Sequence, residues 1–212
     1  MEKKNYDFIM NQIISNLQKE GKIPTLLLHT CCAPCSSQTI ARLSDFFHIT
    51  VYYYNPNIEP FEEYQKRKKE QIRFLKEYIS KYPISFLDCD WENEKFIDLS
   101  CGLEKEKEGG VRCHKCYYLR LEKTAQMAKE KNFDYFTTSL TISPYKDSQV
   151  LNRIGEVLEK EYGVHYLYSD FKKQNGYQKS IEFSKEYGLY RQDYCGCKFS
   201  KEEREKTRNL VS

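Results

Sequence analysis

The chain has 212 residues, of which 40% are hydrophobic, and this suits one compact domain over residues 1–212 with a buried core. Its 34 basic and 31 acidic residues give a net charge of only +3, which excludes a strongly basic chain but not a local nucleic-acid contact. The N-terminal residues lack the apolar segment of a signal peptide, and no stretch approaches the roughly 20 apolar residues of a membrane-spanning helix. We therefore expect a cytoplasmic protein without a membrane partner.

Helices and strands are predicted to alternate along the chain. Amphipathic segments predict helices, whereas short β-branched and aromatic segments predict strands. In chain order, we expect helix 5–20, strand 25–30, helix 36–46, strand 49–54, helix 60–81, strand 84–87, helix 113–131, strand 134–140, helix 146–161, strand 164–168 and helix 176–187. Alternation with crossovers of ten or more residues predicts an α/β fold, in which helices flank a mostly parallel sheet in a Rossmann-like three-layer arrangement.

Nine cysteines are many for a cytoplasmic chain, where reducing pools disfavour structural disulfides. Seven of them form three tight groups: Cys31, Cys32 and Cys35; Cys113 and Cys116; Cys195 and Cys197. The first group directly follows the first predicted strand, and ligands in such folds bind at the carboxyl ends of the strands. The sequence therefore predicts a metal site at that edge of the sheet. Cys89 and Cys101 stand apart, and we assign them no function.

The spacing of the cysteines alone does not identify the metal. Four thiolates from two distant groups suit either a tetrahedral zinc ion or a 4Fe-4S cluster, and a predicted helix N-terminus favours thiolates at Cys113 and Cys116. A zinc site would pair these with Cys32 and Cys35. Side chains of neighbouring residues generally diverge, so Cys31 and Cys32 are expected to reach different irons, which favours the larger cluster.

The Cys195-Gly196-Cys197 segment suggests redox chemistry. A disulfide closing so small a ring would be strained and readily reduced, and glycine permits the backbone angles that such a ring needs. Two further metal ligands are the alternative interpretation.

Several polar residues beside these groups are candidates for substrate binding. Tyr145 and Lys146 follow a predicted strand, where they either line a substrate pocket or belong to a loop that caps the next helix. Arg112 and Arg191 each precede a cysteine group and suit an anionic substrate. The basic run 66–69 is interpreted instead as the solvent-exposed face of a long helix.

Four motifs together resemble the QueH class of epoxyqueuosine reductase. They are His-Thr-Cys-Cys-Ala-Pro-Cys at 29–35, Arg-Cys-His-Lys-Cys at 112–116, Ser-Pro-Tyr-Lys at 143–146 and Tyr-Cys-Gly-Cys at 194–197. The resemblance implies reduction of epoxyqueuosine to queuosine in the tRNA anticodon loop, with electrons from a donor that the sequence does not identify. It implies no cobalamin.

The resemblance also implies the roles of individual cysteines. It assigns a 4Fe-4S cluster to Cys31, Cys32, Cys113 and Cys116, redox-active thiols to Cys195 and Cys197, and an additional mononuclear iron to Cys35 with that last pair. A proton donor is also needed, and the candidates beside the motifs are Tyr145, Asp147, His114 and Asp193.

Two other functions compete with this hypothesis. In the first, the cysteines are structural ligands in a zinc-stabilised nucleic-acid-binding domain without catalysis. In the second, the chain is a sulfur-transferring enzyme of tRNA modification. That class needs a glycine-rich loop after the first strand, and residues 29–37 contain no glycine.

Overall fold

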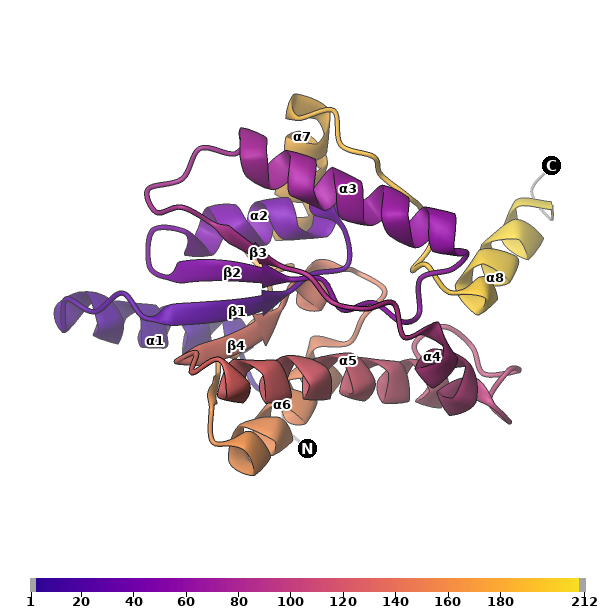
Figure 1. Cartoon of the computed structure of the whole chain (residues 1–212), viewed down its shortest axis with the longest axis horizontal. Helices are drawn as coiled ribbons and strands as arrows, with labels where there is room; N and C mark the ends of the chain where they lie inside the picture. Colours follow the sequence, from indigo (N-terminus) through magenta and orange to yellow (C-terminus); the bar gives the residue numbers. More distant parts are fainter. Residues whose placement is uncertain (1–2, 210–212) are drawn as a thin grey trace.

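A computed structural model describes residues 3–209 and contains a five-stranded parallel sheet in the order β3-β2-β1-β4-β5 (Figure 1). The strands are β1 (Thr25–His29), β2 (His48–Tyr52), β3 (Ser85–Leu87), β4 (Tyr135–Thr138) and β5 (His165–Tyr166). The helices are α1 (Tyr6–Lys19), α2 (Ala33–Leu43), α3 (Phe61–Glu77), α4 (Asn93–Ser100), α5 (Val111–Glu130), α6 (Ser148–Tyr162), α7 (Gly176–Glu186) and α8 (Lys198–Asn209), with a 3-10 turn at Ser139–Ile142. The predicted α/β class with a parallel sheet is confirmed.

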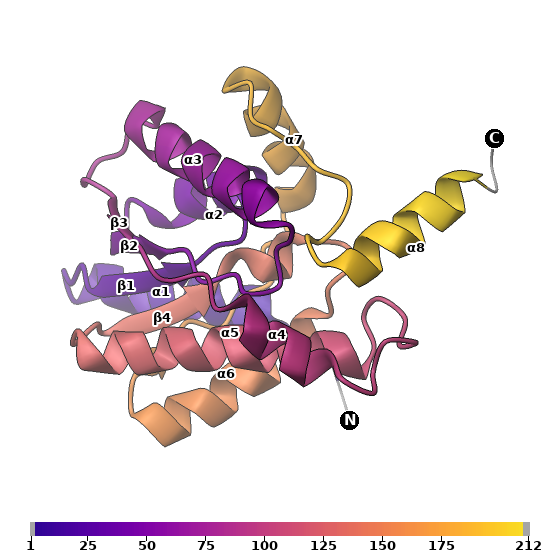
Figure 2. The ribbon, with the colours of Figure 1, turned by 45° about the vertical axis from the view of Figure 1, so that its right-hand side comes forward.

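Alternation along β1 produces the three layers. Leu26 and Leu28 face a core shared with apolar residues of α1, α2 and α3, whereas Leu27 faces a second core under α5 and α6. Figures 1 and 2 show α2, α3 and α7 above the sheet and α5 and α6 below it. Both faces of the sheet are therefore covered, and the carboxyl ends of the strands are left to form a site.

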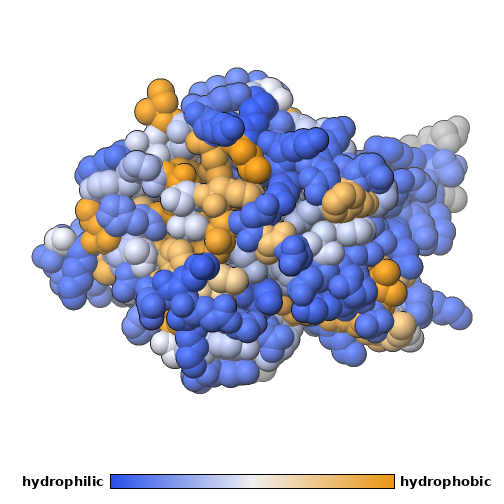
Figure 3. All heavy atoms as spheres, in the orientation of Figure 1, coloured by the Kyte–Doolittle hydropathy of each residue, from blue (hydrophilic) through white to orange (hydrophobic). Residues whose placement is uncertain are grey.

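The outer surface is mostly polar. Figure 3 shows a largely hydrophilic face, with hydrophobic groups gathered near the β3 edge of the sheet. Within residues 3–209, every helix is too short or too polar to cross a bilayer.

Two helices were not predicted, α4 and α8. α8 is so polar that only Phe199 and Ser200 are buried, and Figure 2 shows its far end extending away from the body of the molecule. Its sequence therefore carries no clear apolar stripe, which is the signal that periodicity detects.

Gly155 lets α6 pack directly on β5. A Cβ at this position would lie 2.3 Å from the ring of Tyr166, which is almost fully buried and packs edge-on against Phe136. Alanine gains about 1 kcal/mol of helix propensity, but overpacking of a rigid core costs about 1–3 kcal/mol. We expect Gly155→Ala to lower the free energy of unfolding in urea, whereas the exposed Val157→Ala on the same helix changes it by less than about 0.5 kcal/mol. Equal stability of the two variants would contradict this packing.

Candidate metal centre and adjoining cavity

The first cysteine group lies where β1 passes into α2. β1 ends at His29, Cys32 is the N-cap of α2, and Cys35 is in the first turn of that helix. The Sγ atoms of Cys31 and Cys32 are 3.7 Å apart, and those of all three cysteines lie within 4.8 Å of one another. Among residues 3–209, this is the one set of three or more His, Cys, Asp or Glu ligands with such spacing. The metal site predicted at the strand ends thus has a preformed group of three thiols.

The three thiols share charge unequally. Hydrogen bonds from Cys31 and Cys35 hold the pKa of Cys32 well below its ordinary value, with the Arg67 guanidinium contributing. Hydrogen bonds with Cys31 and Cys32 raise the pKa of Cys35, because they favour its protonated form. One thiolate is therefore favoured within a buried group of thiols, and a bound cation would displace the remaining protons.

His29 supports this turn as a neutral side chain. Its Nε2 lies 3.0 Å from the carbonyl oxygen of Tyr54, which can only accept, so Nδ1 accepts from the Thr138 hydroxyl at 2.9 Å. Burial lowers the pKa of His29 to about 3, with the nearby Arg120 charge adding to the effect. The imidazole thus joins β1, β4 and the segment after β2 without adding charge to the site.

The other two cysteine groups meet at an inner pocket beside the first group. Cys113 and Cys116 lie in the first two turns of α5, and Cys195 and Cys197 lie just before α8. All four line the inner pocket, and Cys195 also lines a larger outer cavity together with Cys31, Cys32 and Cys35. Burial raises the pKa of Cys116 to about 12 and that of Cys197 to about 11.

The convergence of seven cysteines from three distant segments is therefore a property of the fold. The other two cysteines, Cys89 and Cys101, line neither the inner pocket nor the outer cavity. Cys89 donates to the carbonyl oxygen of Tyr53, and Cys101 is exposed.

The Cys195-Gly196-Cys197 segment is held by the backbone before α3 and by Arg67. Gly196 has a φ of +126°, and its carbonyl oxygen accepts from the Glu59 amide at 3.0 Å. A Cβ there would lie 2.9 Å from Ile58, so glycine is required both for the backbone angle and for the close approach. Arg67 donates to the Cys195 carbonyl oxygen at 3.0 Å.

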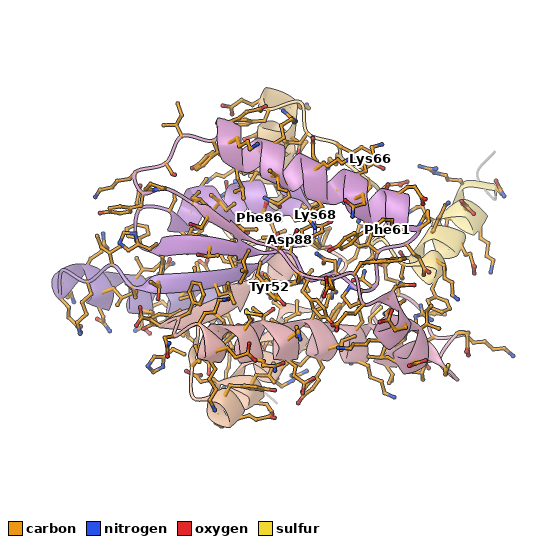
Figure 4. The ribbon with its side chains drawn as sticks, viewed as in Figure 1. Tyr52, Phe61, Lys66, Lys68, Phe86 and Asp88 are labelled. Carbon is orange, nitrogen blue, oxygen red and sulfur yellow. The ribbon has the colours of Figure 1, made fainter. Side chains whose placement is uncertain are left out.

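The interpretation of run 66–69 as an exposed face is wrong for Arg67. This side chain is 1% exposed and pairs with Glu63 at 2.7 Å, because the segment before α8 covers α3 here. The prediction holds for Lys66 and Lys69, which are exposed. Lys68 is mostly buried and pairs with Asp88 beyond the end of β3 (Figure 4).

The outer cavity has a volume of about 360 Å³, and three of the four predicted substrate-binding residues line it: Tyr145, Lys146 and Arg191. Lys146 is almost fully buried; burial alone would lower its pKa, but attraction to Cys195, Tyr117 and Cys31 raises it, which keeps the ammonium charged. Arg112 instead lines the inner pocket, where it donates to the carbonyl oxygen of Leu103 and lies over the Phe199 ring.

Three tyrosine–arginine pairs line the outer cavity. Tyr177 stacks with Arg191, Tyr145 with Arg204 and Tyr194 with Arg67, with 5.1–5.3 Å from guanidinium carbon to ring centroid. Sequence reasoning singled out Tyr145 and Arg191 but missed their partners. The loop interpretation of this segment is also correct in part, because the Asp147 side chain caps α6 by accepting from the Gln149 amide.

The buried polar groups around the cysteines fit a bound anionic centre. Within residues 3–209, both terminal nitrogens of Arg120 and both amide atoms of Asn57 lack a hydrogen-bond partner, and both residues line the inner pocket. Four thiolates bound to iron or zinc carry net negative charge, which suits such donors. The residues present therefore fit a cysteine-ligated metal centre.

Fold and site together define an α/β protein with a group of cysteines that could hold a metal ion at the carboxyl ends of its parallel strands. A family model described as epoxyqueuosine reductase QueH matches residues 26–203. The chain belongs to the QueH family.

Relatives named epoxyqueuosine reductase QueH agree with this over nearly the whole chain. The protein of Streptococcus pyogenes serotype M1 is 46% identical over 94% of this chain and 79% of its own length. That of Staphylococcus epidermidis is 41% identical over 94% of this chain and 85% of its own length. That of Thermotoga maritima is 34% identical over 89% of this chain and 96% of its own length.

Proposed function

We propose that the protein reduces epoxyqueuosine to queuosine in the anticodon loop of tRNA, the last step of queuosine biosynthesis. The observation that carries the proposal is the convergence of three cysteine groups along the outer cavity and the inner pocket, in a chain of the QueH family. We place this chemistry in the cytoplasm, where reducing pools keep exposed thiols reduced.

In this proposal Cys31, Cys32, Cys113 and Cys116 hold a 4Fe-4S cluster, and Cys35, Cys195 and Cys197 are the remaining thiols for an additional iron. A cluster of this kind supplies single electrons and, where an iron has an open position, a Lewis acid for an oxygen atom. Seven cysteines line the outer cavity and the inner pocket, more than the four ligands of one zinc ion, and this supports a larger centre.

Cys195 and Cys197 provide the two thiols that a dithiol two-electron donor needs. Oxidation of two thiols to one disulfide releases two electrons and two protons. Removal of the epoxide oxygen consumes these two electrons and two protons, forms a carbon–carbon double bond and yields one water. An external reductant of low potential must then restore the dithiol. The conformational freedom of Gly196 supports closure of this small ring.

The substrate-facing groups can hold charge and supply protons. In this proposal the Lys146 ammonium, which lines the outer cavity, stabilises the negative charge that the epoxide oxygen gains. Of the candidate proton donors, Tyr145 and Asp193 line the cavity, and Asp193 also pairs with Arg208. Asp147 is used as a helix cap.

The tyrosine–arginine pairs suit a single-stranded RNA loop. Bases stack on aromatic rings and guanidinium planes, while phosphates pair with arginine. We expect Arg191→Gln and Tyr177→Ala each to weaken binding of unmodified substrate tRNA by about 1–3 kcal/mol, and Arg191→Gln to reduce the salt dependence as well. Filter binding at several salt concentrations measures both, with Arg153→Gln on α6 as a control outside both cavities. Unchanged affinity in both variants would remove these pairs from the tRNA interface.

The direct test of function is incubation of anaerobically purified protein with epoxyqueuosine-containing tRNA and a low-potential reductant. Mass analysis of the digested nucleosides should show queuosine, which is lighter by one oxygen atom. Persistent epoxyqueuosine with fully metal-loaded protein would overturn the proposal and favour a binding domain without catalysis.

A further inference from the structure

Arg120 is a buried cation that lines the inner pocket. It lies on α5, one turn after Cys116, and its exposed fraction is 0%. Its Nε donates to the Cys116 carbonyl oxygen at 3.3 Å, whereas both terminal nitrogens lack a partner within residues 3–209. A buried guanidinium with two unsatisfied nitrogens is costly unless something anionic compensates it.

The protein itself offers no carboxylate for this purpose. In the described part of the chain Arg120 forms no salt bridge, and although Glu108 lines the same pocket, its carboxylate is not paired with Arg120. The inner pocket that Arg120 lines is also lined by the cysteines of the second and third groups, Cys113, Cys116, Cys195 and Cys197. Cys195 also lines the outer cavity with the first group, so Arg120 lies close to where the groups meet.

Asn57 completes the polar lining. It is 1% exposed, lines the same pocket, and has neither a donor nor an acceptor for its amide within residues 3–209. Its amide nitrogen is a second buried donor available to a thiolate or a sulfide. Arg112 is another buried arginine that lines this pocket, but its Nη1 donates to the carbonyl oxygens of Leu103 and Glu104, whereas both terminal nitrogens of Arg120 lack a partner within residues 3–209.

We propose that Arg120 is a positioning residue that compensates the negative charge of the cysteine-ligated cluster and raises its reduction potential, with Asn57 as a second hydrogen-bond donor. The inference rests on the proposed 4Fe-4S cofactor. A nearby positive charge stabilises the reduced cluster, which carries one more electron, over the oxidised cluster. Removing the charge therefore shifts the cluster toward the oxidised form at any fixed potential.

The test compares Arg120→Met, Arg120→Lys and wild type as anaerobically purified holoproteins in a redox titration followed by visible absorbance. At a fixed potential we expect the ratio of reduced to oxidised cluster to fall at least tenfold in Arg120→Met, which is about 59 mV for one electron. Arg120→Lys should lie within about threefold of wild type, because it keeps the charge. Arg42→Met, which breaks a distant ion pair with Asp7, is the control for loss of one positive charge and should match wild type.

The outcomes separate the two proposals. A wild-type protein that binds no cluster contradicts the proposed cofactor. A wild type that binds the cluster and reduces epoxyqueuosine, with an unshifted potential in Arg120→Met, overturns only the role of Arg120. If Arg120→Met fails to retain iron, Arg120→Lys decides: full iron and a near-native potential support charge compensation, and loss of the cluster overturns it.

Discussion

Cys32→Ala and Cys116→Ala are each expected to lose the iron centre, lowering bound iron by more than about tenfold. Each removes a buried thiol from a different segment, Cys32 at the start of α2 and Cys116 on α5. If both bind the same centre, either loss leaves too few ligands. Iron and labile sulfide per chain in anaerobically purified protein measure the effect.

Cys101→Ala is the matched control, because this thiol is exposed and lines neither the inner pocket nor the outer cavity. It should retain wild-type iron. Circular dichroism should show that the two iron-poor variants keep their helices. Wild-type iron in Cys116→Ala would show that the groups on β1–α2 and α5 do not share a centre.

Cys195→Ala and Cys197→Ala are expected to behave differently. Both should keep most of the cluster iron, since neither is among the four proposed cluster ligands, yet turnover should fall by at least about a hundredfold. The reason is that one remaining thiol cannot form the disulfide that releases two electrons. Queuosine formed per hour, normalised to bound iron, is the relevant measurement.

These two variants also separate redox from structural roles. Loss of iron together with activity would make Cys195 and Cys197 ligands of the centre, which is the alternative that the sequence left open. Activity at the wild-type rate with the iron retained would refute the redox assignment.

Local sequence patterns predicted the fold well because the strands are short, apolar and followed by polar turns. The strand ending at His29 and the cysteines after it placed the site at the correct edge of the sheet. The boundaries differ by a few residues, and α2 begins early enough to contain Cys35.

Two residues that sequence reasoning missed or misread, Arg67 and Arg120, are buried charges. Arg67 sits in a run of basic residues on a charged helix, and Arg120 follows the Cys113–Cys116 motif without belonging to it. Helical periodicity reports which face of a helix is apolar, but Arg67 is buried by the segment around Cys195, more than a hundred residues away. Such burial depends on tertiary packing, which the local pattern does not encode.

The central claim is that thiolates from three segments of the chain jointly bind iron. The most direct measurement is the metal and sulfide content of anaerobically purified protein together with its visible spectrum. We predict brown protein with about four irons and about four sulfides per chain, or one iron more if the additional site is filled. Colourless protein with a single zinc ion would contradict the claim.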